Sequence, residues 1–323
     1  MGFGLPKRSV LSIFLAFILA FEPGCAASRF HRESLLDQIG RETHPSPLLA
    51  GAAKRDITPP VGTPLAGYAR RRGKPSQGIH DRLYARALAI KNDTDLLLFV
   101  SCDLVVVNEP LYREVLRRIN EKQRVPQASL FLFASHTHSG AGAFGERFFE
   151  RLIAGRYDAR VFEAMSREMA DAALEAMDRL RPARIGLAEG RLEGMIENRM
   201  IESGSVDDEI TVLRVDQEGK PLALLVNFAA HPTVLSAKNM LFSADFPGFM
   251  QSELEDDFPG AVCLFANGAS GDQRIHGFTG RGSFERAQAI GRALAEKTRE
   301  LAQPSAAEEK AEIVALVLET DLP

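Results

Sequence analysis

Two histidines one residue apart, His136 and His138, follow an apolar run at residues 131–134. On extended backbone the side chains at positions i and i+2 point to the same side, so both imidazoles can reach one metal ion or one substrate. Gly140 and Gly142 follow directly, and residues without a side chain let a loop approach a ligand closely. The motif therefore indicates a functional site at the end of a strand, with an ordinary surface loop as the alternative.

A second apolar run, at residues 224–228, leads to a third histidine, His231. Alone, such a histidine is more often structural. Together with His136 it supplies two neutral imidazole ligands, which suit zinc, and hydrolytic zinc sites lower the pKa of bound water towards about 7. Two carboxylates, Asp103 and Asp272, follow comparable stretches. Each could be a metal ligand, an orienting partner of a histidine or a general base.

The runs before these residues have the length and composition of β-strands, and amphipathic segments with the period of an α-helix separate them. This alternation indicates an α/β fold. The strands that we expect span residues 85–90, 96–102, 129–134, 183–188, 210–215, 222–228 and 261–266. The helices that we expect span residues 109–122, 161–180, 246–256 and 283–301.

Two stretches of the chain, residues 85–134 and 210–266, repeat one order of elements: strand, polar turn, strand, helix, strand and polar loop. In this register Asp103 and His231 follow equivalent strands. Ligands of α/β proteins bind at the carboxyl ends of strands, so we expect the strand ends to form one site. The expected fold is an α/β layered sandwich in which duplicated β-β-α-β units form mixed sheets flanked by helices. Coincidence of common α/β patterns is the alternative.

The bulk composition is that of a globular protein, with 323 residues, 45% hydrophobic residues and a net charge of −4. This charge, without a basic stripe, argues against a nucleic-acid partner. We expect an irregular lead-in at residues 28–50 and one domain at residues 51–310. Residues 311–323 are expected to begin a strand or a truncated C-terminal part.

The first 27 residues have the pattern of a secretory signal peptide. Lys7 and Arg8 precede an apolar run at residues 10–21, which is shorter than the roughly 20 residues that span a bilayer. Small residues follow at positions 24–27 and suit a signal peptidase. We therefore expect an exported protein, periplasmic or secreted, with lipid anchoring through Cys25 as the alternative.

Three further features have both a structural and a functional interpretation. Cys102 and Cys263 lie in apolar runs and are expected to be buried free thiols, although a single disulfide is possible in an oxidising compartment. His80 lies near the start of the first repeat, and its place in the site stays open. The basic run at residues 70–74 is expected to be a solvated loop.

In their order along the chain, residues 51–274 resemble the N-terminal catalytic part of the neutral/alkaline, non-lysosomal ceramidase family. The most specific motif is His-Thr-His-Ser-Gly at residues 136–140. The other matching motifs lie at residues 56–59, 77–86, 101–103, 198–199, 228–231 and 267–272.

The resemblance implies a zinc enzyme, because in this family a zinc ion activates water to cleave the amide of ceramide, which releases sphingosine and a fatty acid. His136 and His231 would be the zinc ligands. His138 and Asp272 would take part in catalysis, and Arg199 would bind the substrate or stabilise the oxyanion. The implied substrate is a linear N-acyl amide, most like a ceramide lipid, with peripheral membrane contact through that substrate.

Asn267, His80 and Arg274 are the remaining candidates for substrate contact. Arg274 stands where the family has a serine followed by a proline. The family also draws a glutamate and a tyrosine ligand from further along the chain, and no residue of this sequence matches them. Either the chain is truncated, or Asp103, His138, His80 or Asp272 completes the metal shell. The alternative function is an inactive or truncated domain that binds a ligand or a partner.

Overall fold

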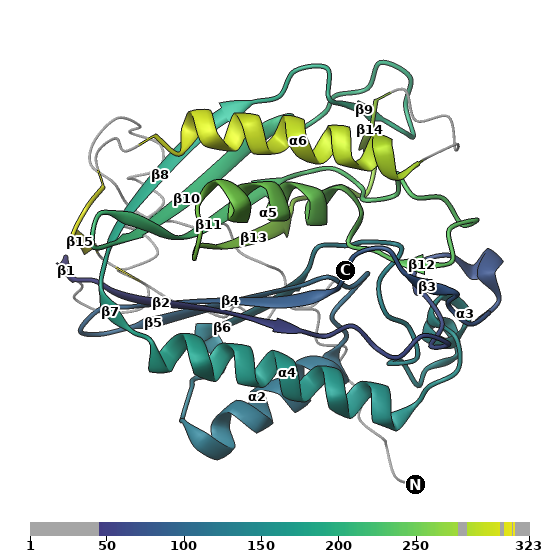
Figure 1. Ribbon diagram of the computed structural model, residues 1–323, viewed down its shortest axis with the longest axis horizontal. Coiled ribbons are helices and arrows are strands. Elements are labelled where there is room, and N and C mark those ends of the chain that lie inside the picture. The colour runs from purple at the N-terminus through teal and green to yellow at the C-terminus, as the bar shows by residue number, and fades with distance from the viewer. Residues whose placement is uncertain (1–44, 277–282, 304–306, 312, 314–323) are drawn as a thin grey trace, which may run out of the picture.

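Two β-sheets stack face to face, and helices cover the outer face of each sheet, so the molecule has four layers (Figure 1). The computed structural model describes residues 45–276, 283–303, 307–311 and 313. The predicted signal peptide at residues 1–27 and most of the predicted C-terminal segment lie outside these ranges. Among the described helices, none has the length and the apolar content needed to cross a membrane.

The first sheet has five strands in the order β6-β5-β4-β2-β7. Its strands are β2 (Leu49–Asp56), β4 (Tyr84–Lys91), β5 (Leu96–Cys102), β6 (Leu130–Ala134) and β7 (Arg181–Pro182). Strand β6 runs parallel to β5, whereas the other neighbours are antiparallel. The amphipathic helices α2 (Glu109–Lys122) and α4 (Ala159–Asp178) bury their apolar faces against this sheet.

The second sheet has four strands in the order β13-β11-β10-β8. Its strands are β8 (Arg184–Arg191), β10 (Glu209–Gln217), β11 (Lys220–Phe228) and β13 (Val262–Asn267). Here β13 is parallel to β11, and the other pairs are antiparallel. Helices α5 (Asp245–Asp257) and α6 (Phe284–Leu301) cover its outer face.

The two sheets share one topology: an antiparallel hairpin, a helix and a strand parallel to the second strand of the hairpin. The elements are β4-β5-α2-β6 in the first sheet and β10-β11-α5-β13 in the second. This is the element order predicted from the sequence. It gives each sheet one pair of parallel strands whose carboxyl ends lie side by side.

Alternating side chains of the strands fill the space between the sheets. Phe99 and Ile90 of the first sheet are fully buried there, as are Leu264 and Val215 of the second. The opposite faces of the same strands pack against the helices. Because side chains alternate along a strand, nearly continuous apolar runs are needed where both faces are buried.

Short elements connect the layers. They are β1 (Ser46–Pro47) paired with β15 (Lys310–Ala311), β3 (Gly78–Ile79) with β12 (Leu241–Phe242), β9 (Ile196–Asn198) with β14 (Gln273–Ile275), the 3-10 helices η1 (Ala69–Arg71) and η2 (Gln127–Ser129), and helix α3 (Phe148–Ala154).

Strand β2 differs from the sequence prediction, because it begins at Leu49, inside the stretch expected to be an irregular lead-in. Half of its residues, those at positions 50–53, are glycine or alanine, which are uncommon in strands. The packing explains them, since a Cβ atom on Gly51 would lie 2.1 Å from the carbonyl oxygen of Ala176 in α4. Close contact with α4, rather than strand propensity, selects small residues here.

Both described cysteines are free thiols, as their apolar surroundings in the sequence predict, and they form no disulfide with each other. Cys102 ends β5 and Cys263 lies in β13, and both are fully buried. Burial raises the pKa of each thiol, so both are protonated and act as small apolar side chains.

Candidate metal centre

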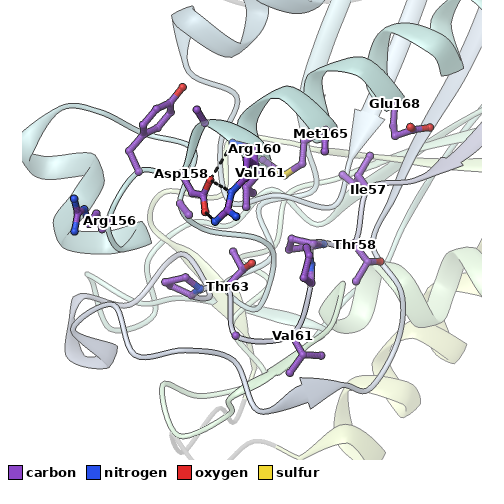
Figure 2. A pocket seen from close by; sticks show the side chains of 18 of the residues that line it. Ile57, Thr58, Val61, Thr63, Arg156, Asp158, Arg160, Val161, Met165 and Glu168 are labelled. Atoms are coloured by element: carbon purple, nitrogen blue, oxygen red, sulfur yellow. Dashed lines mark hydrogen bonds and ion pairs between the residues drawn. The ribbon is translucent and has the colours of Figure 1, made fainter.

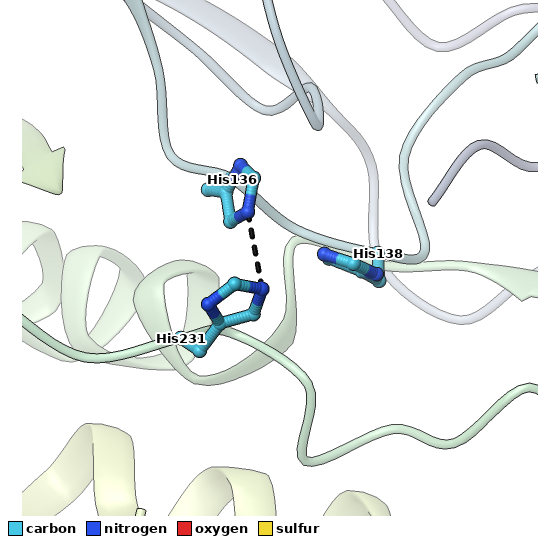
Figure 3. A group of neighbouring side chains, drawn as sticks. All are labelled: His136, His138 and His231. Carbon is cyan, nitrogen blue, oxygen red and sulfur yellow. Dashed lines mark hydrogen bonds between the residues drawn. The ribbon is translucent and has the colours of Figure 1, made fainter. Parts of the chain in front are cut away.

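The loops that follow β6 and β11 bring three histidines together (Figure 3). His136 and His138 come from the first loop and His231 from the second. One nitrogen atom of each ring can be chosen so that all three lie within 4.8 Å of one another. Within the described ranges this is the only group of three or more His, Cys, Asp or Glu residues close enough to hold one metal ion.

The Nδ1 atoms of two of these histidines face backbone carbonyl oxygens. The Nδ1 atom of His136 lies 2.6 Å from the oxygen of Val105, and that of His231 lies 3.1 Å from the oxygen of Ser270. A carbonyl oxygen only accepts hydrogen bonds, so each Nδ1 carries the hydrogen and each Nε2 keeps its lone pair. Such carbonyl contacts orient metal-binding histidines in proteins.

The two Nε2 atoms are turned towards each other. They lie 3.2 Å apart, and the two rings are nearly perpendicular at 84°. Two lone pairs at this distance repel each other unless a cation, either a proton or a metal ion, is shared between them. The carbonyl contacts of His136 and His231 therefore prepare a cation site.

His138 completes the group. Both Nδ1 and Nε2 of its ring are buried and make no hydrogen bond of good geometry, although the backbone of Gly67 lies near enough to oppose in part the lowering of its pKa by burial. The ring centre lies 5.1 Å from those of His136 and His231, and 4.8 Å from that of Tyr68. A buried polar group without a partner costs about 1–3 kcal/mol, and a metal ion would satisfy one of these nitrogens.

All three imidazoles are neutral near pH 7. Burial lowers the pKa of His136, that of His138 to about 3 and that of His231 to about 4. The imidazole of His136 and the positive charge of Arg199 act in the same direction on His231, whereas the contact with the carbonyl oxygen of Ser270 opposes them. Imidazole binds a metal ion only in its neutral form, so the electrostatics favour metal binding over protonation.

The backbone of the first loop is not extended at His136, which has a φ angle of 71° in the left-handed region. The sequence argument that i and i+2 side chains on a strand point the same way therefore applies only up to Ala134, where β6 ends. The backbone N–H of His136 donates to the oxygen of Leu104 at 2.9 Å. Left-handed backbone at a non-glycine residue costs about 1–3 kcal/mol and is concentrated at functional sites.

Arg71 holds this loop in place, although the sequence placed it in a solvated basic run. Its side chain is buried, with 3% exposed, and donates to the backbone oxygens of Ala66 at 2.8 Å, His138 at 2.5 Å and Asn239 at 3.1 Å. Burial lowers its pKa to about 10, still well above neutral pH. Exposure of one residue within a basic run cannot be deduced from composition.

Arg199 and Asp272 are exposed and lie at the segment that follows Ser270, the residue whose carbonyl oxygen faces His231. The Nε and Nη2 atoms of Arg199 donate to the oxygen of Gly271 at 2.9 and 2.5 Å. Its charge contributes to the lowered pKa of both His136 and His231, so the guanidinium is close to them. The carboxylate of Asp272 accepts a hydrogen bond from Nδ2 of Asn198 at 3.0 Å.

Three other candidates lie outside the histidine cluster. Asp103 is buried, and its Oδ2 accepts hydrogen bonds from Arg86 and from the backbone N–H of Tyr84, each at 2.8 Å, whereas its Oδ1 has no hydrogen-bond partner among the described residues. The ring of His80 stacks on Phe284 of α6 at 3.6 Å between centres. Arg274 donates to Glu197 at 2.7 Å, although its backbone pairs with that of His231.

A cavity of about 870 Å³ opens beside the cluster, and His136 and His231 contribute to its wall. The strands of the second sheet give it an apolar level, where Leu187, Leu213 and Leu225 are neighbours across β8, β10 and β11. The next level, nearer the histidines, is polar and consists of the cross-strand neighbours Glu189, Thr211 and Asn227. Phe131 and Phe133 of β6 line the opposite wall, and Asn267 lies at the same end as the histidines.

A second cavity, of about 880 Å³, lies between the segment before η1 and the start of α4 (Figure 2). Its lining includes Thr58, Thr63 and Met165, together with the paired side chains of Asp158 and Arg160. None of the three histidines belongs to this lining. The first cavity is therefore the one associated with the candidate metal centre.

Comparison with known proteins gives one consistent family. Residues 48–274 match the sequence profile described as neutral/alkaline non-lysosomal ceramidase, N-terminal. The neutral ceramidase of Pseudomonas aeruginosa is 28% identical over 246 residues, covering 70% of this chain and 37% of that protein. The neutral ceramidase of Mycobacterium tuberculosis is 26% identical over 222 residues, covering 62% of this chain and 34% of that protein.

Solved structures show the same fold. The crystal structure of the neutral ceramidase from Pseudomonas aeruginosa aligns with a TM-score of 0.74 at 24% identity, covering 84% of this chain and 46% of that one. A structure described as ceramidase complexed with C2 aligns with the same TM-score and covers 45% of its chain. The chain thus spans between 34% and 37% of the length of these two curated relatives.

Proposed function

The chain belongs to the neutral/alkaline non-lysosomal ceramidase family, and from this premise we propose that it is a zinc-dependent amidohydrolase of a linear N-acyl amide, with a ceramide-like lipid as substrate. The observation that carries the proposal is the 3.2 Å separation of the Nε2 atoms of His136 and His231, each ring being oriented by a backbone carbonyl.

The three histidines fit a zinc ion. Two nitrogens bound to one tetrahedral zinc lie about 3.3 Å apart, because each Zn–N bond is about 2.0–2.1 Å long. The observed 3.2 Å between His136 and His231 agrees with that spacing. With His138 as the third ligand, the set has the composition of catalytic zinc sites, which use three protein ligands and leave one position for water or substrate.

Zinc at this position would supply Lewis acidity towards water and the amide carbonyl. The side chains of the protein would contribute charge stabilisation and proton transfer. Arg199 carries a positive charge beside the histidines and would stabilise the negative charge that develops on the carbonyl oxygen. Asp272, held by Asn198, would serve as the proton acceptor and donor.

The cavity supports an amphiphilic substrate. Its level of leucines and phenylalanines suits an alkyl chain, and its polar level, with Glu189, Thr211 and Asn227, lies nearer to the histidines. An N-acyl amide bound with its chain among the apolar residues would have its carbonyl group at the histidine end. Asn267 would then be positioned to contact the polar part of the substrate.

The test is turnover of a panel of fluorescent N-acyl amides that includes a short-chain ceramide, with zinc-loaded, zinc-free and His136→Ala protein. We expect turnover by the zinc-loaded wild type alone. Wild-type protein that binds zinc but cleaves no amide in the panel would contradict the proposal. That outcome would favour the second candidate, a ligand-binding domain, for which the arginine at position 274 in place of the family serine is the specific observation.

We propose in addition that the chain is exported and that residues 1–27 form the signal peptide. Support comes from Lys7 and Arg8 before the apolar run at residues 10–21 and from the small residues at positions 24–27. Mass spectrometry of the mature protein tests this. Loss of about the first 27 residues is expected, a lipid on Cys25 would indicate anchoring, and a retained N-terminus would contradict export.

A further inference from the structure

Helix α3 exposes three large apolar side chains on one short segment. Phe148 and Phe149 are each 75% exposed and Leu152 is 49% exposed. Single exposed apolar residues are common on protein surfaces, but adjacent phenylalanines on a two-turn helix form a patch. Their rings contact each other at 5.5 Å between centres and have no further aromatic neighbour among the described residues. Figure 1 shows α3 at one end of the molecule.

Positive charges surround this patch. Residues 69–75 and 146–156 together contain seven arginine or lysine residues and two acidic ones, whereas the whole chain has a net charge of −4. Arg147 is paired with Glu109 at 3.7 Å. Five others are exposed and make no ion pair with any residue that the structure describes: Arg70, Arg72, Lys74, Arg151 and Arg156.

The basic segment and α3 form one continuous surface. The backbone N–H of Gly67 donates to the oxygen of Ile153 in α3 at 3.0 Å. At the end of the helix, a Cβ atom on Gly155 would lie 2.7 Å from Pro64 and 3.3 Å from Gly73, so no side chain fits between the two segments. We call this surface, formed by residues 69–75 and 146–156, the α3 surface.

The α3 surface adjoins the metal centre. Gly67 packs so tightly on His138 that a Cβ atom there would lie 2.7 Å from its ring. Arg71, within η1, donates to the backbone oxygen of His138 at 2.5 Å. The loop that presents the exposed cations on one side therefore supports a candidate metal ligand on the other.

We propose that the α3 surface binds the face of an anionic lipid bilayer, with Phe148, Phe149 and Leu152 in the interfacial region and the unpaired cations against lipid phosphates. Aromatic side chains are favoured at the boundary between headgroups and acyl chains. Each basic residue near an anionic membrane surface contributes about 1 kcal/mol of binding. The uncompensated positive charge favours a lipid surface over a partner recognised by apolar contact alone.

This inference deepens the proposed function, because an amidase of a lipid must reach a substrate that resides in a bilayer. The binding itself needs only the exposed side chains and not an active metal centre. A failure of catalysis and a failure of lipid binding can thus be observed separately.

Vesicle co-sedimentation of the full chain tests the proposal. The vesicles contain phosphatidylcholine alone or mixed with anionic phosphatidylglycerol. We expect binding to the anionic vesicles, weakened by added salt, and much weaker binding to phosphatidylcholine. Phe148→Ser/Phe149→Ser and Arg151→Gln/Arg156→Gln should each weaken binding to anionic vesicles by about tenfold or more.

Two matched controls test whether position rather than composition matters. Arg124→Gln removes an exposed cation that also has no ion-pair partner in the described ranges but follows α2. Met200→Ser removes an apolar side chain that is 74% exposed. Both should bind vesicles as the wild type does. Zinc content and turnover of a short-chain, water-soluble N-acyl amide should be unchanged in the α3 variants, which also verifies that they are folded.

Wild-type protein that does not bind anionic vesicles would overturn the proposal, as would α3 variants that bind as tightly as the wild type. If an acidic protein rather than a membrane occupied the surface, vesicle binding would be absent. If vesicle binding depends on α3 but no amide is cleaved by any form, the proposed function fails and the lipid-binding surface stands.

Discussion

The Nε2 atom of His136 lies 3.2 Å from the Nε2 atom of His231, and each ring is fixed from behind by a backbone carbonyl, of Val105 and of Ser270. The two residues are separated by 95 positions in the sequence and belong to loops of different sheets. The loops after two strands therefore direct two nitrogen lone pairs to the same point. This arrangement is favourable only when a cation occupies that point.

Added zinc should raise the thermal stability of the protein. A ligand that binds only the folded state at a free concentration of 100 times its dissociation constant adds about 2.7 kcal/mol to the free energy of unfolding. Thermal denaturation with and without zinc measures this. His231→Ala removes one nitrogen of the pair and should abolish the increase, and an equal increase in this variant would place the bound zinc elsewhere.

The metal-free protein should lose stability in acid. The pKa of His138 is lowered from 6.5 to about 3 and that of His231 from 6.5 to about 4, so the folded state binds protons less readily than the unfolded state. Their contribution is fully present above pH 6.5 and is lost as the pH falls towards these folded-state values. Urea denaturation between neutral and acidic pH measures the slope, and His138→Gln should flatten it. A slope unchanged in that variant contradicts the assignment.

Removal of the Arg71 side chain should destabilise the loop that carries His138. Arg71→Met leaves carbonyl oxygens of Ala66, His138 and Asn239 without their donor. Each buried unsatisfied group costs about 1–3 kcal/mol, so we expect a loss of several kcal/mol in the free energy of unfolding, with weaker zinc binding. Arg70→Met, next to it but exposed, is the matched control and should be close to wild type in both measurements.

Asp103 should affect stability but not metal content. Its carboxylate faces Arg86, whose side chain is 3% exposed, so Asp103→Asn leaves a buried charge with less compensation. Breaking a buried ion pair on one side costs about 3–5 kcal/mol, reduced here because Glu255 also contacts Arg86 at 3.2 Å. Denaturation and zinc analysis of the same variant separate the two roles. Loss of zinc from a folded variant would show that Asp103 acts on the metal.

Sequence patterns were sufficient for elements whose apolar periodicity is strong. The predicted bounds of β5 and α2 agree with the structure at both ends, because a continuous apolar run and a capped amphipathic pattern leave no alternative. Asn108 caps α2 by accepting from Leu111 N–H at 3.1 Å. Strand β2 could not be found in this way, since tight packing against α4 removes the large apolar residues that mark a strand.

The internal repeat was informative about position but not about side-chain direction. It correctly placed His231 and Asp103 after equivalent strands, β11 and β5. The side chain of His231 points towards His136, whereas the side chain of Asp103 forms an ion pair with Arg86. Which way a residue turns after a strand depends on the neighbouring layer, and a single sequence carries no signal for that.

The most direct test of the metal centre is the amount of zinc per chain, measured by elemental analysis after dialysis against zinc and then against zinc-free buffer. The three-histidine arrangement predicts one zinc ion per wild-type chain, and in His136→Ala or His231→Ala a retained fraction below about a tenth. A folded wild-type protein that holds no zinc, or alanine variants that hold as much as the wild type, would contradict the account.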